Sequence, residues 1–125
     1  MFGKKKPKNT IKVMYYEGLD GFSQDFPCTI KLENELLIIT NQTTTAKLSI
    51  NEITTIDTLP EENFLAKYHN TTGTTAKMGT KFYYVIKFSS STGEPKHIAF
   101  WDVRSKTMTY FLKLREKIQP HEHYL

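Results

Sequence analysis

Apolar residues recur at every second position in several short stretches of the chain, the spacing of β-strands with one buried face. In the first half of the chain these stretches cover residues 11–16, 28–32 and 46–50. Residues 36–40 are apolar up to a final threonine, which is typical of a strand covered on both faces. Ile53 and Ile56 follow at a three-residue spacing, so we expect a bulge or bend near Asn51 and Glu52.

The second half of the chain contains the clearest hairpin pattern. Two sets of side chains alternate from residue 82 to residue 88, namely Phe82, Tyr84, Ile86 and Phe88 against Tyr83, Val85 and Lys87. Polar residues follow as far as Gly93 and Pro95, which favour a turn. Residues 97–101 then return as the second strand, with Phe100 and Trp101 at its end.

Helical spacing is present in two places. Residues 58–61 have a capping-box pattern, and Phe64, Leu65 and Tyr68 after it would share one helical face, with a strand over residues 63–68 as the alternative. Near the end of the chain, a stripe at intervals of three and four residues predicts a helix over residues 103–119. This stripe consists of Thr107, Phe111, Leu114 and Ile118, with Asp102 or Ser105 as its cap.

Short strands with no helices between them require antiparallel pairing. The final helix has an apolar stripe that must be buried on the resulting sheet. We therefore predict a mainly β (α+β) fold, a curved antiparallel sheet or open barrel of about seven strands capped by one C-terminal helix. With 125 residues the chain fits one domain, over residues 11–119, between a basic disordered arm at 1–10 and a flexible tail at 120–125.

Several stretches resemble the pleckstrin-homology-like (PH-like) superfold, and bacterial PH-like and GRAM-like domains in particular. These stretches are Glu17-Gly18-Leu19, Leu36-Leu37-Ile38 and residues 47–56, 82–88 and 98–100. The likeness covers residues 11–118 and consists of buried positions, none of them catalytic. It implies the predicted sheet and helix and a role in lipid binding, peptide binding or structure. It also implies that an extended peptide could add as a strand beside the C-terminal helix.

One segment departs from the PH domains that bind phosphoinositides. Those domains hold the phosphates with basic residues on the first two strands and the loop between them. Here residues 17–25 contain three acids and no base. A phosphate close to these carboxylates would be repelled by about 1 kcal/mol per pair even in water, so we do not expect that ligand at its usual site.

The net charge of +4 is distributed unevenly along the chain. Residues 1–12 carry five lysines and no acid, residues 13–66 carry nine acids and two lysines, and residues 67–125 carry ten bases and four acids. Lys4, Lys5, Lys6 and Lys8 are therefore candidates for contact with an anionic surface. Four lysines at about 1 kcal/mol each would give a weak, salt-sensitive attraction.

Residues capable of catalysis or metal binding are few. Cys28, the single cysteine, alternates with apolar positions and is interpreted as a buried structural thiol. His121 and His123 fall in the tail without the further ligands that zinc requires. We expect no enzymatic activity, no metal and no cofactor. With no internal disulfide and no long apolar run, the expected location is the cytoplasm of a bacterial cell, with contact to the membrane periphery as an extension of that hypothesis.

The function predicted from these features is that of a binding or adaptor module for another protein or peptide. Leu19, Phe22 and Phe26 fall in a loop-like stretch and are the candidate interaction patch. The other interpretation of these three residues is that they cover the open end of the barrel. Peripheral binding to an anionic membrane through the lysine-rich arm is the alternative function, and non-specific nucleic-acid binding a further one.

Overall fold

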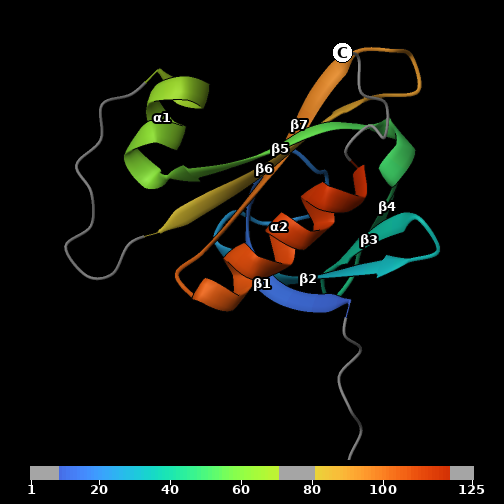
Figure 1. Ribbon diagram of the computed structural model, residues 1–125, viewed down its shortest axis with the longest axis horizontal. Helices are drawn as coiled ribbons and strands as arrows, with labels where there is room; N and C mark the ends of the chain where they lie inside the picture. The colour runs from blue at the N-terminus through green and yellow to red at the C-terminus, as the bar shows by residue number, and fades with distance from the viewer. Residues whose placement is uncertain (1–8, 71–80, 119–125) are drawn as a thin grey trace, which may run out of the picture.

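A computed structural model of the protein describes residues 9–70 and 81–118. Within these residues, a seven-stranded antiparallel sheet has the order β4-β3-β2-β1-β7-β6-β5 (Figure 1). The strands are β1 (Thr10–Glu17), β2 (Phe26–Glu33), β3 (Leu36–Thr40), β4 (Thr45–Ser49), β5 (Ile53–Pro60), β6 (Phe82–Ser89) and β7 (Pro95–Asp102). The helices are α1 (Glu61–His69) and α2 (Ser105–Ile118). The predicted fold class is confirmed, and α1 is present in addition to the C-terminal helix.

Local backbone geometry explains how the first strands connect. Asn34 and Glu35 both have positive φ, at 51° and 69°, so they form a tight two-residue turn that places Glu33 opposite Leu36. The bend expected near Asn51 and Glu52 is confirmed as a short 3₁₀ helix over Ile50–Glu52, which joins β4 to β5. This bend carries the chain from one edge of the sheet to the other.

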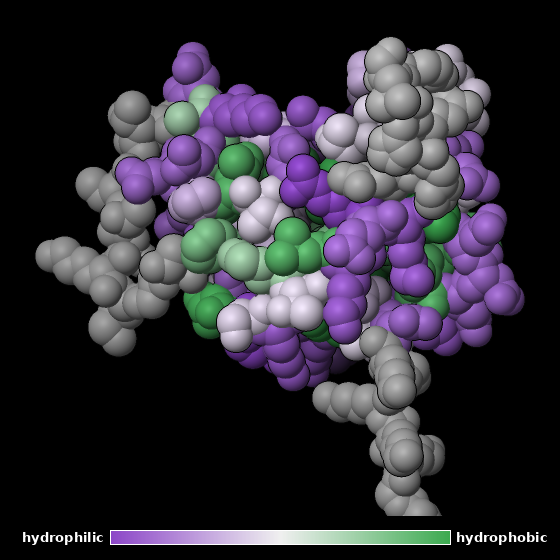
Figure 2. All heavy atoms as spheres, in the orientation of Figure 1, coloured by the Kyte–Doolittle hydropathy of each residue, from purple (hydrophilic) through white to green (hydrophobic). Residues whose placement is uncertain are grey.

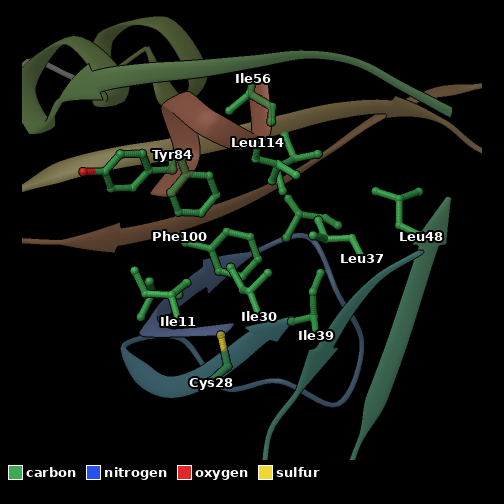
Figure 3. Packing of buried hydrophobic residues seen from close by; sticks show 14 of the residues in the cluster. Ile11, Cys28, Ile30, Leu37, Ile39, Leu48, Ile56, Tyr84, Phe100 and Leu114 are labelled. Carbon is green, nitrogen blue, oxygen red and sulfur yellow. The ribbon is translucent and has the colours of Figure 1, made fainter. Parts of the chain in front are cut away.

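The sheet curves so that the β1–β4 half and the β5–β7 half face each other across the inner core (Figure 3). Apolar residues of the predicted strands point into this core, including Ile30, Leu37 and Phe100, each fully buried. Phe111 of α2 stacks on Tyr84 with ring centres 4.4 Å apart. Packing of this kind fixes α2 against the sheet.

Two details of the α2 prediction need correction, the first residue of the helix and the burial of Ile118. The helix begins at Ser105, two residues later than expected, and Gln119 lies outside the described residues. Ile118 is partly buried, whereas the stripe predicted a buried side chain. Asp102 accepts hydrogen bonds from the backbone N–H of Val103 and, at 3.4 Å, from that of Arg104, so it orders the chain just before the helix.

A second apolar cluster lies on the outer face of β5, β6 and β7, where α1 covers it. Phe64 of α1 stacks on Tyr83 with ring centres 4.2 Å apart. As a result four consecutive residues of β6, Tyr83 to Ile86, are buried. The strand covered on both faces is thus β6 and not residues 36–40, because Leu36 is 37% exposed.

The structure also decides between the two readings of residues 63–68, which are helical. The predicted capping box is wrong, because Thr58 lies within β5 opposite Tyr84. Pro60 takes the N-cap position without a side-chain hydrogen bond. α1 is instead stabilised at its start by acidic residues in the first turn. At its end, Asn70 takes the left-handed conformation that commonly terminates a helix. Neither α1 nor α2 is long and apolar enough to span a membrane.

Candidate functional site

The predicted interaction patch divides into a packed part and an exposed part. Leu19 and Phe22 are partly buried against the inner core. The backbone N–H of Leu19 donates to the Tyr15 hydroxyl over 2.6 Å, and the Phe22 ring centre lies 5.2 Å from that of Tyr15. Phe26 begins β2 with 63% of its surface exposed. Of the three residues, Phe26 alone presents its side chain mainly to solvent.

Phe26 borders a cavity of about 530 Å³ that residues of β1, β2 and β3 line. Lys12, Thr29 and Thr40 also line this cavity, because they occupy the outward positions of their strands. Asn41 lies at its edge and accepts hydrogen bonds from the backbone of Thr43 and Thr44. The lining therefore mixes polar side chains with one exposed aromatic ring.

Three predicted features fall at least partly outside the described residues: the basic arm, the tail histidines and the loop over residues 69–80. Lys4, Lys5, Lys6 and Lys8 of the basic arm lie outside them, as do His121 and His123. The long loop expected over residues 69–80 lies outside them from residue 71 onward. His69 and Asn70, at its start, belong to the end of α1.

Cys28, the single cysteine, and His97 of β7 lie on opposite faces of the sheet. Cys28 is part of the inner core, and burial raises the pKa of its thiol to about 12. A thiol with so high a pKa is a poor nucleophile at neutral pH. His97 is on the outer side of β7, because the neighbouring Ile98 points into the inner core. The two side chains therefore cannot act as a nucleophile and its base.

Glu17 connects three elements through its carboxylate. Its Oε1 lies 2.8 Å from Nε2 of His69 at the end of α1, and its Oε2 lies 2.7 Å from Nε2 of His97 in β7. The contact with His97 is a hydrogen bond, and because an ionised carboxylate only accepts, the imidazole of His97 donates its Nε2–H. Across the described residues, no group of three or more His, Cys, Asp or Glu side chains is arranged to hold a metal ion. Because Glu17 of β1 contacts His69 at the end of α1 and His97 of β7, it anchors α1 to the sheet.

Asp57 of β5 is a second anchor for α1. It accepts hydrogen bonds from the Tyr68 hydroxyl at 2.9 Å and from Nζ of Lys67 at 3.2 Å, and Lys87 lies 3.7 Å away. Burial would raise the pKa of this carboxyl, but these hydrogen bonds and lysine charges outweigh burial and lower the pKa. Asp57 is thus held as a carboxylate by structural partners.

The free edge of β5 is the longest unpaired strand edge of the sheet. β5 spans eight residues and pairs with β6 alone among the described strands, whereas β4, the other edge strand, spans five. Among the described residues, no backbone hydrogen bond outside that pairing reaches residues 54–59. An unpaired edge of this length can accept an added strand.

The α2 helix packs against both β5 and β1, and its two flanks differ in character. Tyr110 and Lys113 lie on the flank next to β1, where they line a cavity with Thr10. At about 100° per residue, Met108 and Leu112 fall on the opposite flank, toward β5. Leu112 is 45% exposed. Figure 2 shows hydrophobic atoms gathered in a band over α2 on this face of the molecule.

Sequence reasoning missed the flanks of α2, although part of the signal was present. Leu112 widens the buried stripe in the sequence pattern, and nothing local shows that it remains exposed. The contacts of Glu17 could not be found, because His69 and His97 are far from it in the sequence. Spacing within one element cannot report pairings of this kind.

Comparison with known proteins assigns no function to these surfaces. No protein-family model matches the chain, and no curated protein sequence matches it. The resemblance to PH-like and GRAM-like domains therefore stays a prediction from the sequence, beside the seven-stranded antiparallel sheet and C-terminal helix that the structure shows.

Proposed function

We propose that the chain is a non-enzymatic binding module for an extended segment of another protein, which adds to the free edge of β5 beside α2. The observation that carries this proposal is the exposure of Leu112 on the flank of α2 that faces β5. Strand addition combines main-chain hydrogen bonds from an open edge with pockets or surfaces for alternate side chains. The unpaired edge of β5 would supply the main-chain hydrogen bonds, and the flank of α2 that carries Leu112 would supply the surface for side chains.

The two sheet edges are not equally suited to this role. β4 carries Lys47 at its centre with an exposed side chain, and a charge in this position discourages pairing with another strand. β5 offers residues 53–59 before Pro60, which lacks an N–H to donate. Partners that add a strand are therefore expected at β5.

The residues with potential reactivity also favour binding over catalysis. Cys28 is enclosed in the inner core, and His97 is paired with Glu17 on the outer face. Both are used in packing or anchoring. The proposed surface instead presents main-chain groups and apolar side chains, which recognise extended peptides.

A peptide selection with the full-length protein as bait tests the proposal. Displayed random peptides that bind should protect backbone amides of β5 from hydrogen exchange. Leu112→Glu should weaken their binding by about tenfold or more, since a central apolar contact typically contributes that much, while the melting temperature stays nearly unchanged.

Leu36→Glu provides the matched control, because Leu36 is a similarly exposed leucine on β3. Its affinity for the selected peptides should equal that of the unmodified protein. Equal loss of binding in both variants, or amide protection confined to β1–β4, would place the binding surface elsewhere.

A further inference from the structure

A cavity of about 550 Å³ lies between the first half of β1 and α2. It forms because β7 pairs with β1 from Met14 onward, which leaves residues 10–13 without a strand neighbour on that side. Side chains take the place of the missing strand. Arg104 donates to the Lys12 carbonyl, and the Tyr110 hydroxyl donates to the Asn9 carbonyl over 2.8 Å.

The charged residues lining this cavity are all basic: Lys12, Arg104, Lys106 and Lys113. Arg104 is paired with Asp102, with Nη2 and Oδ2 separated by 2.7 Å. The three lysines make no ion pair within the part of the chain that the structure describes. None of these three lining lysines is therefore paired with a carboxylate of the described residues.

A buried hydroxyl group gives a second, independent indication of a ligand. Oγ1 of Thr10 is buried and has no hydrogen-bond partner among the described residues. Thr10 is itself one of the residues that line the cavity. Buried polar side-chain atoms nearly always have a partner. Because this hydroxyl has no described partner to give up, a turn of the Thr10 side chain can direct it to an acceptor atom bound in the cavity.

We infer that this cavity binds a phosphoryl group. A phosphoryl group carries close to two negative charges and three acceptor oxygens, which suits several lysines acting as point charges together with one hydroxyl donor. A carboxylate fits less well, because its planar pair of oxygens is best matched by a free guanidinium. The guanidinium of Arg104 is already engaged by Asp102 and the Lys12 carbonyl.

The location of the cavity agrees with the charge of the rest of β1. The far end of the strand and the loop after it carry Glu17, Asp20 and Asp25, which repel anions. The cavity lies at the opposite end, on the flank of α2 next to β1. It is separate from the Leu112 flank, so its test is independent of the proposed peptide site.

Titration of the full-length protein with inorganic phosphate, followed by ¹H–¹⁵N NMR, tests the inference. Equal ionic strength of sodium chloride serves as the reference. Saturable shifts are expected for the amides of Thr10, Lys12 and Lys106. Shifts that stay linear with phosphate concentration, or that match those in chloride, would overturn the inference.

Paired charge variants of α2 identify the site. Lys106→Gln combined with Lys113→Gln should weaken phosphate binding by about tenfold or more, since hydrogen bonds to charged groups typically contribute at least that factor. Arg115→Gln combined with Lys117→Gln removes the same charge from exposed positions of the same helix that do not line the cavity. Equal weakening in both pairs would show general electrostatic attraction and reject the site.

Thr10→Val separates a ligand contact from a structural role. The substitution removes the unpartnered hydroxyl and keeps the shape of the side chain. Phosphate affinity should fall while the melting temperature stays equal or rises, because a buried hydroxyl without a partner destabilises the fold. Unchanged phosphate affinity would contradict a role for Thr10 in the site.

Vesicle binding distinguishes two sources of the phosphoryl group, a lipid headgroup and a small soluble phosphate compound. Co-sedimentation is measured with phosphatidylcholine vesicles that contain either phosphatidic acid, a phosphomonoester, or phosphatidylglycerol, a phosphodiester. Preference for phosphatidic acid that is lost in Lys106→Gln/Lys113→Gln would identify a lipid headgroup. Saturable phosphate binding without this preference would identify a small soluble phosphate compound, and both results support the site.

Discussion

Individual side chains in this protein are held by partners from distant parts of the chain. Glu17 accepts a hydrogen bond from His97 and lies 2.8 Å from Nε2 of His69, and the Trp101 Nε1–H donates to Asp25 over 2.8 Å. Gly18 lies between these contacts with a φ of 114°, and a Cβ there would meet the His97 carbonyl oxygen at 2.3 Å. A glycine is therefore required where β1 ends.

At the residue scale, Leu19 and Phe22 should behave as core residues and Phe26 as a surface residue. Leu19→Ser with Phe22→Ser should lower the free energy of unfolding by about 1–3 kcal/mol, because both side chains pack against the core. Phe26→Ser should change it by less than about 0.5 kcal/mol. Urea denaturation measures both changes. A neutral double variant would return Leu19 and Phe22 to the candidate interaction patch.

Among the secondary-structure elements, α1 and α2 cover different faces of the same strands. α1 packs Phe64 on the outer face of β6, and α2 packs Phe111 on its inner face. Asp102 joins β7 to α2, since its Oδ2 accepts hydrogen bonds from the Arg104 side chain and the Thr107 hydroxyl. The start of α2 therefore depends on one buried carboxylate.

Asp102→Asn should show this dependence as a change in acid stability. Burial would raise the pKa of Asp102, but hydrogen bonds from Arg104, Thr107 and the Val103 amide outweigh burial and lower it. A lowered pKa stabilises the fold above the unfolded value of about 3.9, and this stabilisation is lost as the pH falls through the folded value. At neutral pH the variant should lose about 1–3 kcal/mol.

The difference between the variant and the unmodified protein should shrink as the pH falls below about 4, which chemical denaturation at several pH values measures. Asp20→Asn, at an exposed position in the loop after β1, is the control and should remain close to the unmodified protein throughout. A pH-independent loss in Asp102→Asn would mean that packing, and not charge, explains it.

At the scale of the whole molecule, acids and bases gather at opposite ends of β1. Glu17, Asp20 and Asp25 occupy the end of β1 and the following loop, while Lys12, Lys106 and Lys113 surround its first half. The lysines of the arm directly precede this basic region in the chain. Long-range attraction of anionic partners is therefore expected toward the start of β1.

Deletion of residues 1–8 tests the predicted role of the arm. The deletion keeps Asn9, whose carbonyl accepts hydrogen bonds from the Leu32 amide and the Tyr110 hydroxyl, so the melting temperature should stay nearly unchanged. Binding to phosphatidylglycerol vesicles or to DNA should weaken strongly, and in the full chain it should fall steeply with added salt. Co-sedimentation that survives the deletion would assign this binding to the folded domain.

The sequence by itself determined which side chains point into the inner core, where the chain turns, and that a C-terminal helix closes an antiparallel sheet. These properties follow from spacing within single elements, such as the alternation through Tyr84 and Ile86 or the stripe through Phe111 and Leu114. Because helical spacing is also local, the central residues of the predicted α2 stripe, Phe111 and Leu114, are buried as expected.

Only the tertiary structure decided which strand is covered twice, which exposed leucine borders an open edge, and which bases surround a cavity. Residues 36–40 and β6 have similar apolar runs, and the position of α1 makes β6 the strand buried on both faces. Lys12 and Lys113 converge because β7 ends its pairing with β1 at Met14. Such relations join residues far apart in the chain, and local spacing contains no record of them.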